Sequence, residues 1–228
     1  NDGRFWITYN GEIYNFKEIK KQLSNLGYKF YSETDTEVIL CAFKEWGTNS
    51  FHMFNGMWSF AILDTVKNCL IISRDRYGVK PCYYYNDNEK YIFSSEIKGI
   101  FASESEIKID KNKIILLSKD LEKSLTTIYQ NLNIVPPGCF FEIDLNSYKV
   151  NKVRWWKGLD NFPNISINIK SIKEKLSELL FDATQKRLIA DVKIATSLSG
   201  GVDSSVIFSI LNNINKEKNN EKINLNPF

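Results

Sequence analysis

The first 157 residues carry short runs of apolar and aromatic residues joined by polar turns, and some of these runs, such as Phe5-Trp6-Ile7-Thr8-Tyr9, alternate as half-buried β-strands do. We expect strands at residues 4–9, 58–63, 70–73, 91–94 and 140–143, and the aromatic residues that gather in these stretches suit a sheet. Asn10-Gly11 follows the first stretch, and this dipeptide is a strong signal for a hairpin turn. The sequence therefore predicts a mainly antiparallel first domain that opens with a hairpin.

Two helices interrupt these strands. The first is expected over residues 16–26, with Asn15 as its N-cap and Gly27 as its stop. The second is expected to begin at Thr34, which has capping-box spacing to Glu37, and to end at Gly47. Their apolar residues recur at helical spacing and form the faces that should be buried: Phe16, Ile19, Leu23 and Leu26 in the first, and Val38, Ile39, Ala42 and Phe43 in the second.

A change of pattern near residue 158 indicates a second domain. Residues 158–169 are rich in Asn and include a proline, so we place the linker there, between domains at 1–157 and 158–228. A helix over residues 172–188, opened by a Ser171–Glu174 capping box, should bury Ile172, Leu176, Leu179, Leu180 and Ala183. An apolar strand at 194–198 and a helix from 206 then predict the beginning of a doubly wound parallel α/β domain.

The junction between that strand and that helix has the sequence Ser-Gly-Gly-Val-Asp-Ser-Ser at residues 199–205. Two glycines allow a tight turn, and the first N–H groups of a helix have no intrahelical acceptor, so an anion fits there. Asp203 can hold a magnesium ion shared with phosphates. The absence of Lys separates this loop from the common P-loop. The alternative is a plain turn in which Asp203 and Ser204 cap the helix, but the complete pattern favours a phosphate site.

A second candidate site lies at Asn10-Gly11-Glu12. The Asn10 amide and the Gly11 N–H are the kind of donors that stabilise a tetrahedral oxyanion in acyl transfer. Glu12 and Asp35 can bind a substrate ammonium group through charge-assisted hydrogen bonds. Spacing alone favours a plain type I′ turn at Asn10-Gly11 and a helix cap at Asp35.

Composition and charge exclude several classes of protein. With 30 basic and 27 acidic residues and a net charge of +3, the chain has no polybasic stripe, so we expect no nucleic-acid or membrane binding. We find neither a signal sequence nor an apolar run near the ~18 residues of a membrane span, which favours a cytoplasmic protein. The 4 cysteines lack metal-ligand spacing, and the single histidine excludes a histidine-rich metal site.

The two candidate sites carry resemblances to known families. Residues 199–205 resemble the loop of the PP-loop ATP pyrophosphatases, while residues 9–15, 34–39 and 74–81 resemble the glutaminase domain of class II amidotransferases, in that family's order. Residues 95–98, 135–138 and 190–192 are similar to the glutamine-hydrolysing asparagine synthetases in particular; only 109–127 match weakly. The resemblance implies an N-terminal nucleophile domain, an αββα sandwich, followed by the beginning of a synthetase domain.

This resemblance implies roles for individual residues. Asn10 and Gly11 would form the oxyanion hole, and Glu12 and Asp35 would hold the amino group of glutamine. Arg74, Asp75 and Glu96 would fix loops and the passage between domains. The residues implied for ATP binding are Ser197, Ser199, Gly200, Gly201, Asp203 and Ser204, with Asp203 as the Mg²⁺ ligand.

The activity implied is that of a ligase for asparagine biosynthesis. Glutamine would be hydrolysed to glutamate and ammonia, and aspartate would be adenylylated by ATP and amidated, releasing AMP and pyrophosphate. The small-molecule partners would be glutamine, aspartate and ATP, with Mg²⁺ as the cofactor. The oligomeric state, including a homodimer, is left open.

The chain departs from this family in one important respect. The family's nucleophile is a cysteine directly after the initiator Met, and Cys41, Cys69, Cys82 and Cys139 match no catalytic position. The arginine that grips the glutamine carboxylate, the second acidic loop of the synthetase and the aspartate-binding residues are also missing. We therefore expect an internal fragment that catalyses neither half-reaction.

Two alternative functions remain open from the sequence. One is an amidotransferase acting on another carboxylate, either in cell-surface sugar biosynthesis or in the manner of a β-lactam synthetase whose glutaminase half is inactive. The other belongs to a different class, a non-catalytic glutamine-binding or scaffold module.

Overall fold

The computed structural model describes residues 3–87, 89–104, 106–119, 125–158, 168–190, 194–218 and 223–224. By its contacts the chain divides into two units, Asn1–Asn161 and Phe162–Phe228. The expected domain boundary after residue 157 stays a prediction, because most of the expected linker, residues 159–167, lies outside the described residues. Asp191 and Val192, which belong to the stretch 190–192 named above, also lie outside them.

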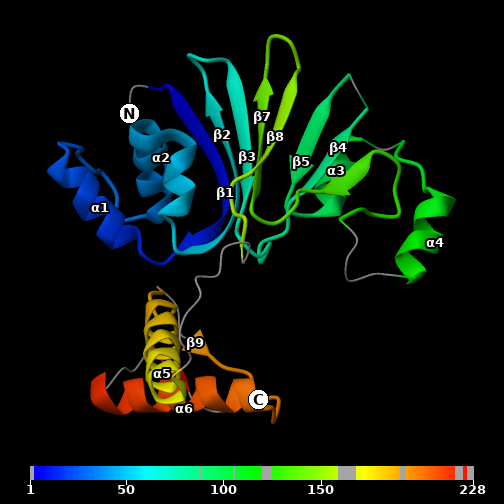
Figure 1. The fold of residues 1–228 in the computed structure, drawn as a ribbon. Coiled ribbons are helices and arrows are strands. Elements are labelled where there is room, and N and C mark those ends of the chain that lie inside the picture. Colours follow the sequence, from blue (N-terminus) through cyan, green and yellow to red (C-terminus); the bar gives the residue numbers. More distant parts are fainter. Residues whose placement is uncertain are drawn as a thin grey trace. The chain divides into compact units, whose positions relative to one another are not determined.

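The first unit is built around a five-stranded antiparallel sheet. Its strands stand in the order β1-β2-β3-β7-β8, so that β1 and β8 are the edges (Figure 1). The strands predicted at 58–63, 70–73 and 140–143 are confirmed with small shifts at their ends, and β1 continues four residues beyond the predicted 4–9. The bounds are Phe5–Ile13 (β1), Gly56–Asp64 (β2), Cys69–Arg74 (β3), Cys139–Asp144 (β7) and Val150–Arg154 (β8).

A second, three-stranded antiparallel sheet has the order β5-β4-β6. Its strands are Tyr83–Asn86 (β4), Tyr91–Ser94 (β5) and Leu132–Ile134 (β6). Tyr84, Tyr91 and Phe93 of this sheet pack against a buried cluster that contains Ala61, Ile72 and Phe141 of the larger sheet. The interface between the two sheets is therefore one hydrophobic core.

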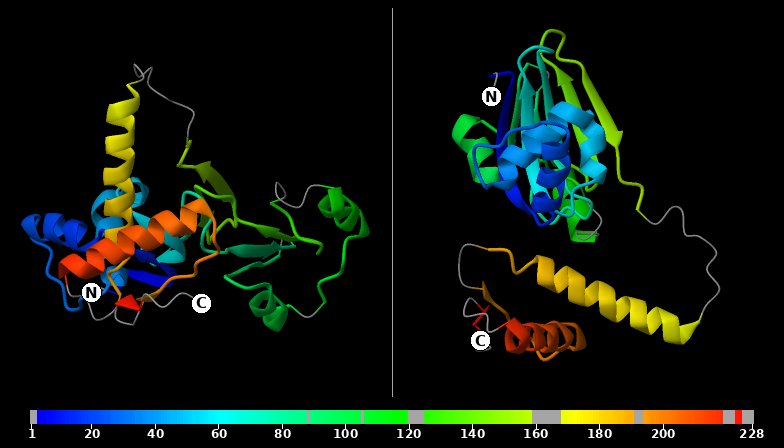
Figure 2. Two further views of the ribbon diagram at one scale, coloured as in Figure 1. Left: turned by 90° about the horizontal axis from the view of Figure 1, so that it is seen from below. Right: turned by 90° about the vertical axis from the view of Figure 1, so that its left-hand side faces the viewer.

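Helices cover the outer faces of both sheets. The helices α1 (Phe16–Asn25) and α2 (Asp35–Trp46), with the 3₁₀ helix η1 (Gly47–His52), lie against the larger sheet, as the right-hand view of Figure 2 shows. The helix α3 (Ile97–Ser103) packs Ile97 and Ile100 against the smaller sheet, and α4 (Lys111–Lys119) follows it. The layers are helix, sheet, sheet and helix, so the predicted αββα sandwich is confirmed. The sequence pattern missed α3, α4 and β6.

The core between α2 and the larger sheet is aromatic. Phe51 of η1 is fully buried, and the ring centroids of five other aromatic residues lie within 6.3 Å of its own. Aromatic pairs at such separations add to the free energy gained by burying their area. These rings come from helix, sheet and the end of the unit: Phe43, Phe54, Phe60, Phe140 and Trp155.

The hairpin predicted at Asn10-Gly11 was wrong. β1 runs without a turn from Phe5 to Ile13, and Asn10 and Gly11 pair with Ser59 and Trp58 of β2. An Asn-Gly pair favours a turn only when its two flanks pair with each other. Here both flanks pair with the same distant strand, so tertiary pairing overrides the local preference.

The capping box predicted for α2 was also wrong, although Thr34 and Asn15 are the N-caps of α2 and α1 as predicted. The Glu37 carboxylate does not close a capping box with Thr34; it accepts hydrogen bonds from the N–H groups of Tyr31 and Ser32 and from the Ser32 hydroxyl. Asn15 occupies the N-cap position of α1, but its side chain bonds the turn at residues 53–55 instead. These polar side chains therefore bind loop residues and not the N–H groups of their own helix. Leu26, expected on the buried face of α1, is exposed.

The second unit contains the expected strand–loop–helix order. The helix α5 (Ile169–Lys186) is followed by β9 (Ile194–Ala195), α6 (Val202–Lys218) and β10 (Ile223–Asn224), and β9 and β10 pair in parallel. α5 and α6, yellow and orange to red in Figure 2, are in contact. The strand is shorter than the predicted 194–198, and the last helix begins four residues earlier than predicted because it includes the first turn at 202–205.

The predicted cap and buried face of α5 were wrong. The N-cap is Asn168, whose side chain accepts from the N–H groups of Lys170 and Ser171, in place of the Ser171–Glu174 capping box. Ile172, Leu176 and Leu179, expected inward, are each about half exposed. The described residues of this unit offer a two-stranded sheet, which is too small to cover that face of an 18-residue helix.

Among the described residues, no helix is both long and apolar enough to cross a membrane.

The aromatic core makes a direct stability prediction. Phe51→Ala should lower the free energy of unfolding by about 3–5 kcal/mol, because truncation of a buried Phe loses its transfer energy and leaves a cavity. Urea unfolding of the 228-residue chain, followed by tryptophan fluorescence, measures the loss. Tyr31→Ala is the control, since Tyr31 is 85% exposed and its loss should change stability by less than ~0.5 kcal/mol. Equal effects of the two variants would contradict the central place of Phe51.

Candidate functional site

The first candidate site lies on β1, and its side chains face two directions. Asn10 faces the space between the two sheets, where its Nδ2 donates to Ser95 Oγ over 3.1 Å. Ser95 follows β5, so this bond joins the two sheets. The surrounding cleft has a volume of about 750 Å³ and combines small and polar side chains of β1 and β2 with residues around β5 and α3: Thr8, Tyr9, Asn10, Ser59, Phe60, Ala61, Phe93, Ser94, Ser95, Glu96, Lys98, Gly99 and Ala102.

The Gly11 N–H points to the open edge of β1. Tyr14 N–H donates to Asn55 O on the β2 side, whereas Ile13 N–H donates away from β2, to the Asp35 carboxylate. Successive N–H groups of a strand alternate in direction, and β1 pairs with β2 in unbroken register, so the Gly11 N–H has the same direction as that of Ile13. Within the part of the chain that the structure describes, this N–H has no acceptor, so it can bind a ligand oxygen.

Gly11 is required at this position by packing. An added Cβ would lie 2.3 Å from Met57 O and 2.8 Å from Trp58 Cα, closer than any side chain can approach. The backbones of β1 and β2 therefore leave no room for a side chain here. The same constraint holds the Gly11 N–H in place, because the strand is pressed against its neighbour.

Asp35 is brought to β1 from the first turn of α2. Its Oδ2 accepts from the Tyr9 hydroxyl over 2.7 Å and from Ile13 N–H over 2.9 Å. Burial, together with the hydrogen bond to Asp35 and the charges of Asp35 and Glu12, raises the pKa of Tyr9 far above its usual range. Both carboxylates therefore lie near the same hydroxyl. The structure brings all four predicted residues, Asn10, Gly11, Glu12 and Asp35, to one end of β1.

Tyr9 and Ser95 were not found by sequence reasoning. Ser95 lies 85 positions from Asn10 along the chain, and no local spacing links the two. Tyr9 alternates with Asn10 in a strand, a pattern that by itself indicates only a residue on the opposite face.

Arg74 and Asp75, expected to fix loops, hold the segment between β3 and β4. The Arg74 guanidinium donates to the carbonyls of Gly78, Lys80 and Val135 over 2.7–2.8 Å. The buried Asp75 carboxylate accepts from four backbone N–H groups, those of Trp58, Tyr77, Val79 and Lys80. Glu96 lines the cleft and forms an ion pair with Lys98. A role of Glu96 in a passage between domains stays a prediction.

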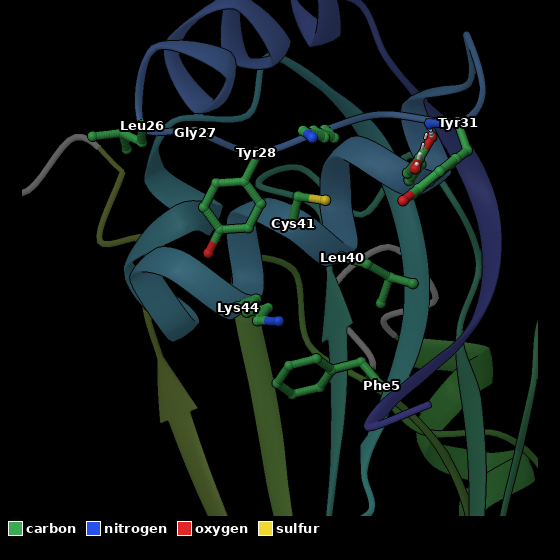
Figure 3. Close-up of a pocket in the computed structure, with 10 residues that line it drawn as sticks. Phe5, Leu26, Gly27, Tyr28, Tyr31, Leu40, Cys41 and Lys44 are labelled. Atoms are coloured by element: carbon green, nitrogen blue, oxygen red, sulfur yellow. Dashed lines mark hydrogen bonds between the residues drawn. The ribbon is translucent and has the colours of Figure 1, made fainter. Parts of the chain in front are cut away.

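None of the four cysteines has the character of a nucleophile. A reactive thiol needs a lowered pKa, yet burial raises the pKa of Cys41, Cys69, Cys82 and Cys139. Cys82 is completely buried between the sheets. Cys41 lines a separate pocket of about 460 Å³ beside α2, with Phe5, Tyr28 and Lys44 (Figure 3).

The second candidate site is the loop between β9 and α6. Gly200 has a φ of +79°, and no atom lies within 4 Å of where its Cβ would be, so the loop is open as well as tightly turned. The hydroxyls of Ser199 and Ser204 are 3.1 Å apart. Ser204 and Ser205 donate to Gly201 O over 3.1 and 2.8 Å, which closes the first turn of α6. Ser199 and Asp203 are exposed.

This loop fits a phosphate group. The first N–H groups of α6 point into it, and the helix dipole adds partial positive charge. For Mg²⁺ the loop supplies one carboxylate, Asp203, in the first turn of the helix. The described residues contain no cluster of three or more metal-ligating side chains. That donor set suits an ion held mainly by substrate phosphates and water, as is usual for Mg²⁺.

The Tyr9–Asp35 pair predicts a pH dependence of stability. The folded state raises the pKa of Tyr9, so the proton is held more tightly in the folded than in the unfolded chain, whose tyrosines ionise near pH ~10. The stability from this pair is present below that pH and is lost as the pH rises above it. The stability difference between wild type and Tyr9→Phe should therefore shrink from pH ~8 to ~11, measured by urea unfolding. Tyr148→Phe, at an exposed position, controls for the loss of a hydroxyl, and a difference that is constant with pH would contradict the prediction.

Both candidate sites lie in segments that match known protein families. Residues 1–156 match the family model for the glutamine amidotransferase domain, and residues 175–224 match that for asparagine synthase. A protein of Methanocaldococcus jannaschii named putative asparagine synthetase [glutamine-hydrolyzing] 2 is 37% identical over 90% of this chain and 40% of its own length. The asparagine synthetase [glutamine-hydrolyzing] of Gallus gallus is 30% identical over 94% of this chain and 37% of its own. The chain thus spans two fifths or less of the length of these relatives.

Comparison with solved structures supports the fold. The glutamine phosphoribosylpyrophosphate amidotransferase of B. subtilis, complexed with ADP and GMP, aligns with a TM-score of 0.51 at 19% identity, covering 92% of this chain and 44% of its own. A structure described as the allosteric regulatory enzyme of purine biosynthesis aligns with a TM-score of 0.51 at 20% identity, covering 91% of this chain and 42% of its own. At such identity the likeness concerns the fold alone. Since the amidotransferase model spans residues 1–156 of 228, the chain belongs to the glutamine amidotransferase family, with an asparagine synthase segment behind that domain.

Proposed function

We propose that this chain is part of an enzyme that makes an amide with ammonia taken from glutamine, at the expense of ATP. One observation carries the proposal: a single polypeptide joins oxyanion-type donors and paired carboxylates on β1 to a lysine-free phosphate loop before α6. The first set suits release of ammonia from an amide, and the second suits activation of a carboxylate by ATP.

The β1 site is proposed to bind and polarise glutamine. The Asn10 amide and the Gly11 N–H would donate to the oxygen of the side-chain amide as it becomes an oxyanion. The hydrogen bonds from Tyr9 and Ile13 occupy Asp35 Oδ2 and orient its other oxygen, which with Glu12 would hold the α-ammonium group. Burial raises the pKa of each of the four cysteine thiols, so none of them is proposed as the attacking nucleophile, and we propose that these residues alone do not hydrolyse glutamine.

The loop before α6 is proposed to bind ATP. Ser197, Ser199, Gly200, Gly201 and Ser204 would surround the phosphates, with hydroxyls and N–H groups as donors, and Asp203 would hold Mg²⁺. The bound ion would neutralise charge on the departing pyrophosphate. The carboxylate of the acceptor attacks the α-phosphate, pyrophosphate leaves, and ammonia then displaces AMP to form the amide. Aspartate is the proposed acceptor and asparagine the product, in line with the names of the similar synthetases.

The phosphate loop is tested by exchange between ATP and pyrophosphate. In the protein expressed from the complete reading frame that contains this segment, Asp203→Asn should lower the exchange rate by about 10²-fold or more, because charge on the leaving group loses its counter-ion. Asp182→Asn is the matched control, since Asp182 lies on α5 and pairs with Lys186. Retained exchange in Asp203→Asn would refute the ATP site.

The oxyanion site is tested by glutamine hydrolysis in the same protein. Asn10→Ala should lower kcat for glutamate formation by about 10²–10³-fold with little change in KM, because the donor acts on the transition state. Amide synthesis from added ammonium should persist, since the ATP site is unchanged. Asn151→Ala, at an exposed position of β8, is the matched control. An equal fall in kcat and in ammonium-dependent synthesis would argue for general destabilisation instead.

A further inference from the structure

Arg76, in the segment between β3 and β4, holds the turn at residues 52–55, which connects η1 to β2. Its Nη1 donates to Phe54 O over 2.5 Å, and its Nη2 donates to His52 O over 2.9 Å. These carbonyls belong to the end of η1 and to the turn that leads into β2. A planar guanidinium presents donors in a fixed fork, so the two bonds set both the position and the orientation of the turn.

The same guanidinium lies among three tryptophan rings. Its Cζ is 5.8 Å from the ring centroid of Trp58, 5.2 Å from that of Trp155 and 5.0 Å from that of Trp156. The rings of Trp58 and Trp155 are themselves stacked at 5.6 Å and 17°. A cation within about 6 Å of an aromatic face is attracted to it, and the attraction grows as water is excluded. Burial among these rings lowers the pKa of Arg76 below its ordinary value.

Trp155 and Trp156 directly follow β8 and are held by Gly138, the residue before β7. Both donate their backbone N–H to Gly138 O, over 3.0 and 3.1 Å. Gly138 has a φ of +64°, and an added Cβ would lie 2.8 Å from Trp156 Cβ. The chain therefore leaves the first unit along a path defined by Gly138 beneath it and Arg76 beside it.

The turn held by Arg76 is also bound to the two residues that directly follow β1. Asn15 Nδ2 donates to Met53 O over 2.9 Å, and Asn15 Oδ1 accepts from Asn55 N–H over 2.8 Å. Tyr14 N–H donates to Asn55 O over 2.8 Å. Tyr14 and Asn15 directly follow the Asn10–Ile13 end of β1. The turn at residues 52–55 thus connects the β1 site on one side to Arg76 and the two tryptophans on the other.

We propose that Arg76 is a positioning residue that holds the turn at residues 52–55 and the tryptophan pair in place beside the β1 site. An effect on glutamine hydrolysis rests on the proposed function, whereas the guanidinium contacts themselves, called the clamp below, do not. Lys at this position would keep the charge but lose the fork and the planar stacking surface. Arg76→Lys therefore removes the clamp while preserving the local charge.

The clamp is tested by amide hydrogen exchange on the 228-residue chain. Arg76→Lys should speed exchange about tenfold at residues 53–58 and 155–157, because local opening no longer breaks the guanidinium contacts, while the remaining sheet keeps its protection. Arg4→Lys is the matched control: Arg4 also pairs through a fork, with Asp64, and stacks on Phe5, at the opposite end of β1 and β2. It should leave residues 155–157 unchanged. Unchanged exchange there in Arg76→Lys would overturn the clamp.

The positioning role is tested by glutamine hydrolysis in the protein expressed from the complete reading frame. Arg76→Lys should lower kcat for glutamate formation several-fold, because the turn that holds the end of β1 is less firmly fixed, while KM for glutamine and ammonium-dependent synthesis stay unchanged. A merely structural role would lower all rates together. Faster exchange with unchanged kcat would overturn the positioning role. If wild type releases no glutamate from glutamine, the proposed function fails, while the exchange data still decide the clamp.

Discussion

The pairing of β1 with β2 is the constraint on which the first unit depends. The register places Gly11 opposite Trp58, where the two backbones meet so closely that a Cβ would collide with Met57 O. A shift by one residue would turn Asn10 away from the space between the sheets and exchange the directions of the Gly11 and Glu12 N–H groups. The chemistry proposed for this strand thus depends on a register set by sterics, and the glycine is the residue that permits it.

Three consecutive charged residues, Arg74, Asp75 and Arg76, organise the loops around that pairing. Arg74 donates to carbonyls of two loops, Asp75 accepts from four N–H groups, and Arg76 joins a turn to a tryptophan stack. Buried charges are tolerated when hydrogen bonds satisfy them. Here the partners are backbone groups of irregular segments, which have no ladder of their own. The hydrogen bonds that satisfy these buried charges therefore also order the loops of this unit.

Much of the fold could be predicted from local pattern. The strands β2, β3, β5 and β7 were found because they are short runs rich in apolar and aromatic residues between polar turns, and α1 and α2 were found because each buries one helical face. The motif at residues 199–205 indicated its strand–loop–helix setting for the same local reason. The short α3 and β6 were missed because 7 and 3 residues carry too little periodicity. The face of α5 was misjudged because burial depends on a neighbouring surface, which the sequence of a helix does not contain.

The sequence by itself determined which residue types stand together: Asn10-Gly11-Glu12, Arg74-Asp75-Arg76 and the serine- and glycine-rich loop before α6. Only the tertiary structure decided what these groups contact. Asn10-Gly11 is a strand and not a turn because its partner lies 47 residues away at Trp58, and Asn10 meets Ser95 from a different sheet. Asp35 reaches β1 instead of capping its own helix. The physical reason is the same in each case: local preferences are worth little free energy beside the burial and hydrogen bonding that distant segments contribute when they pack.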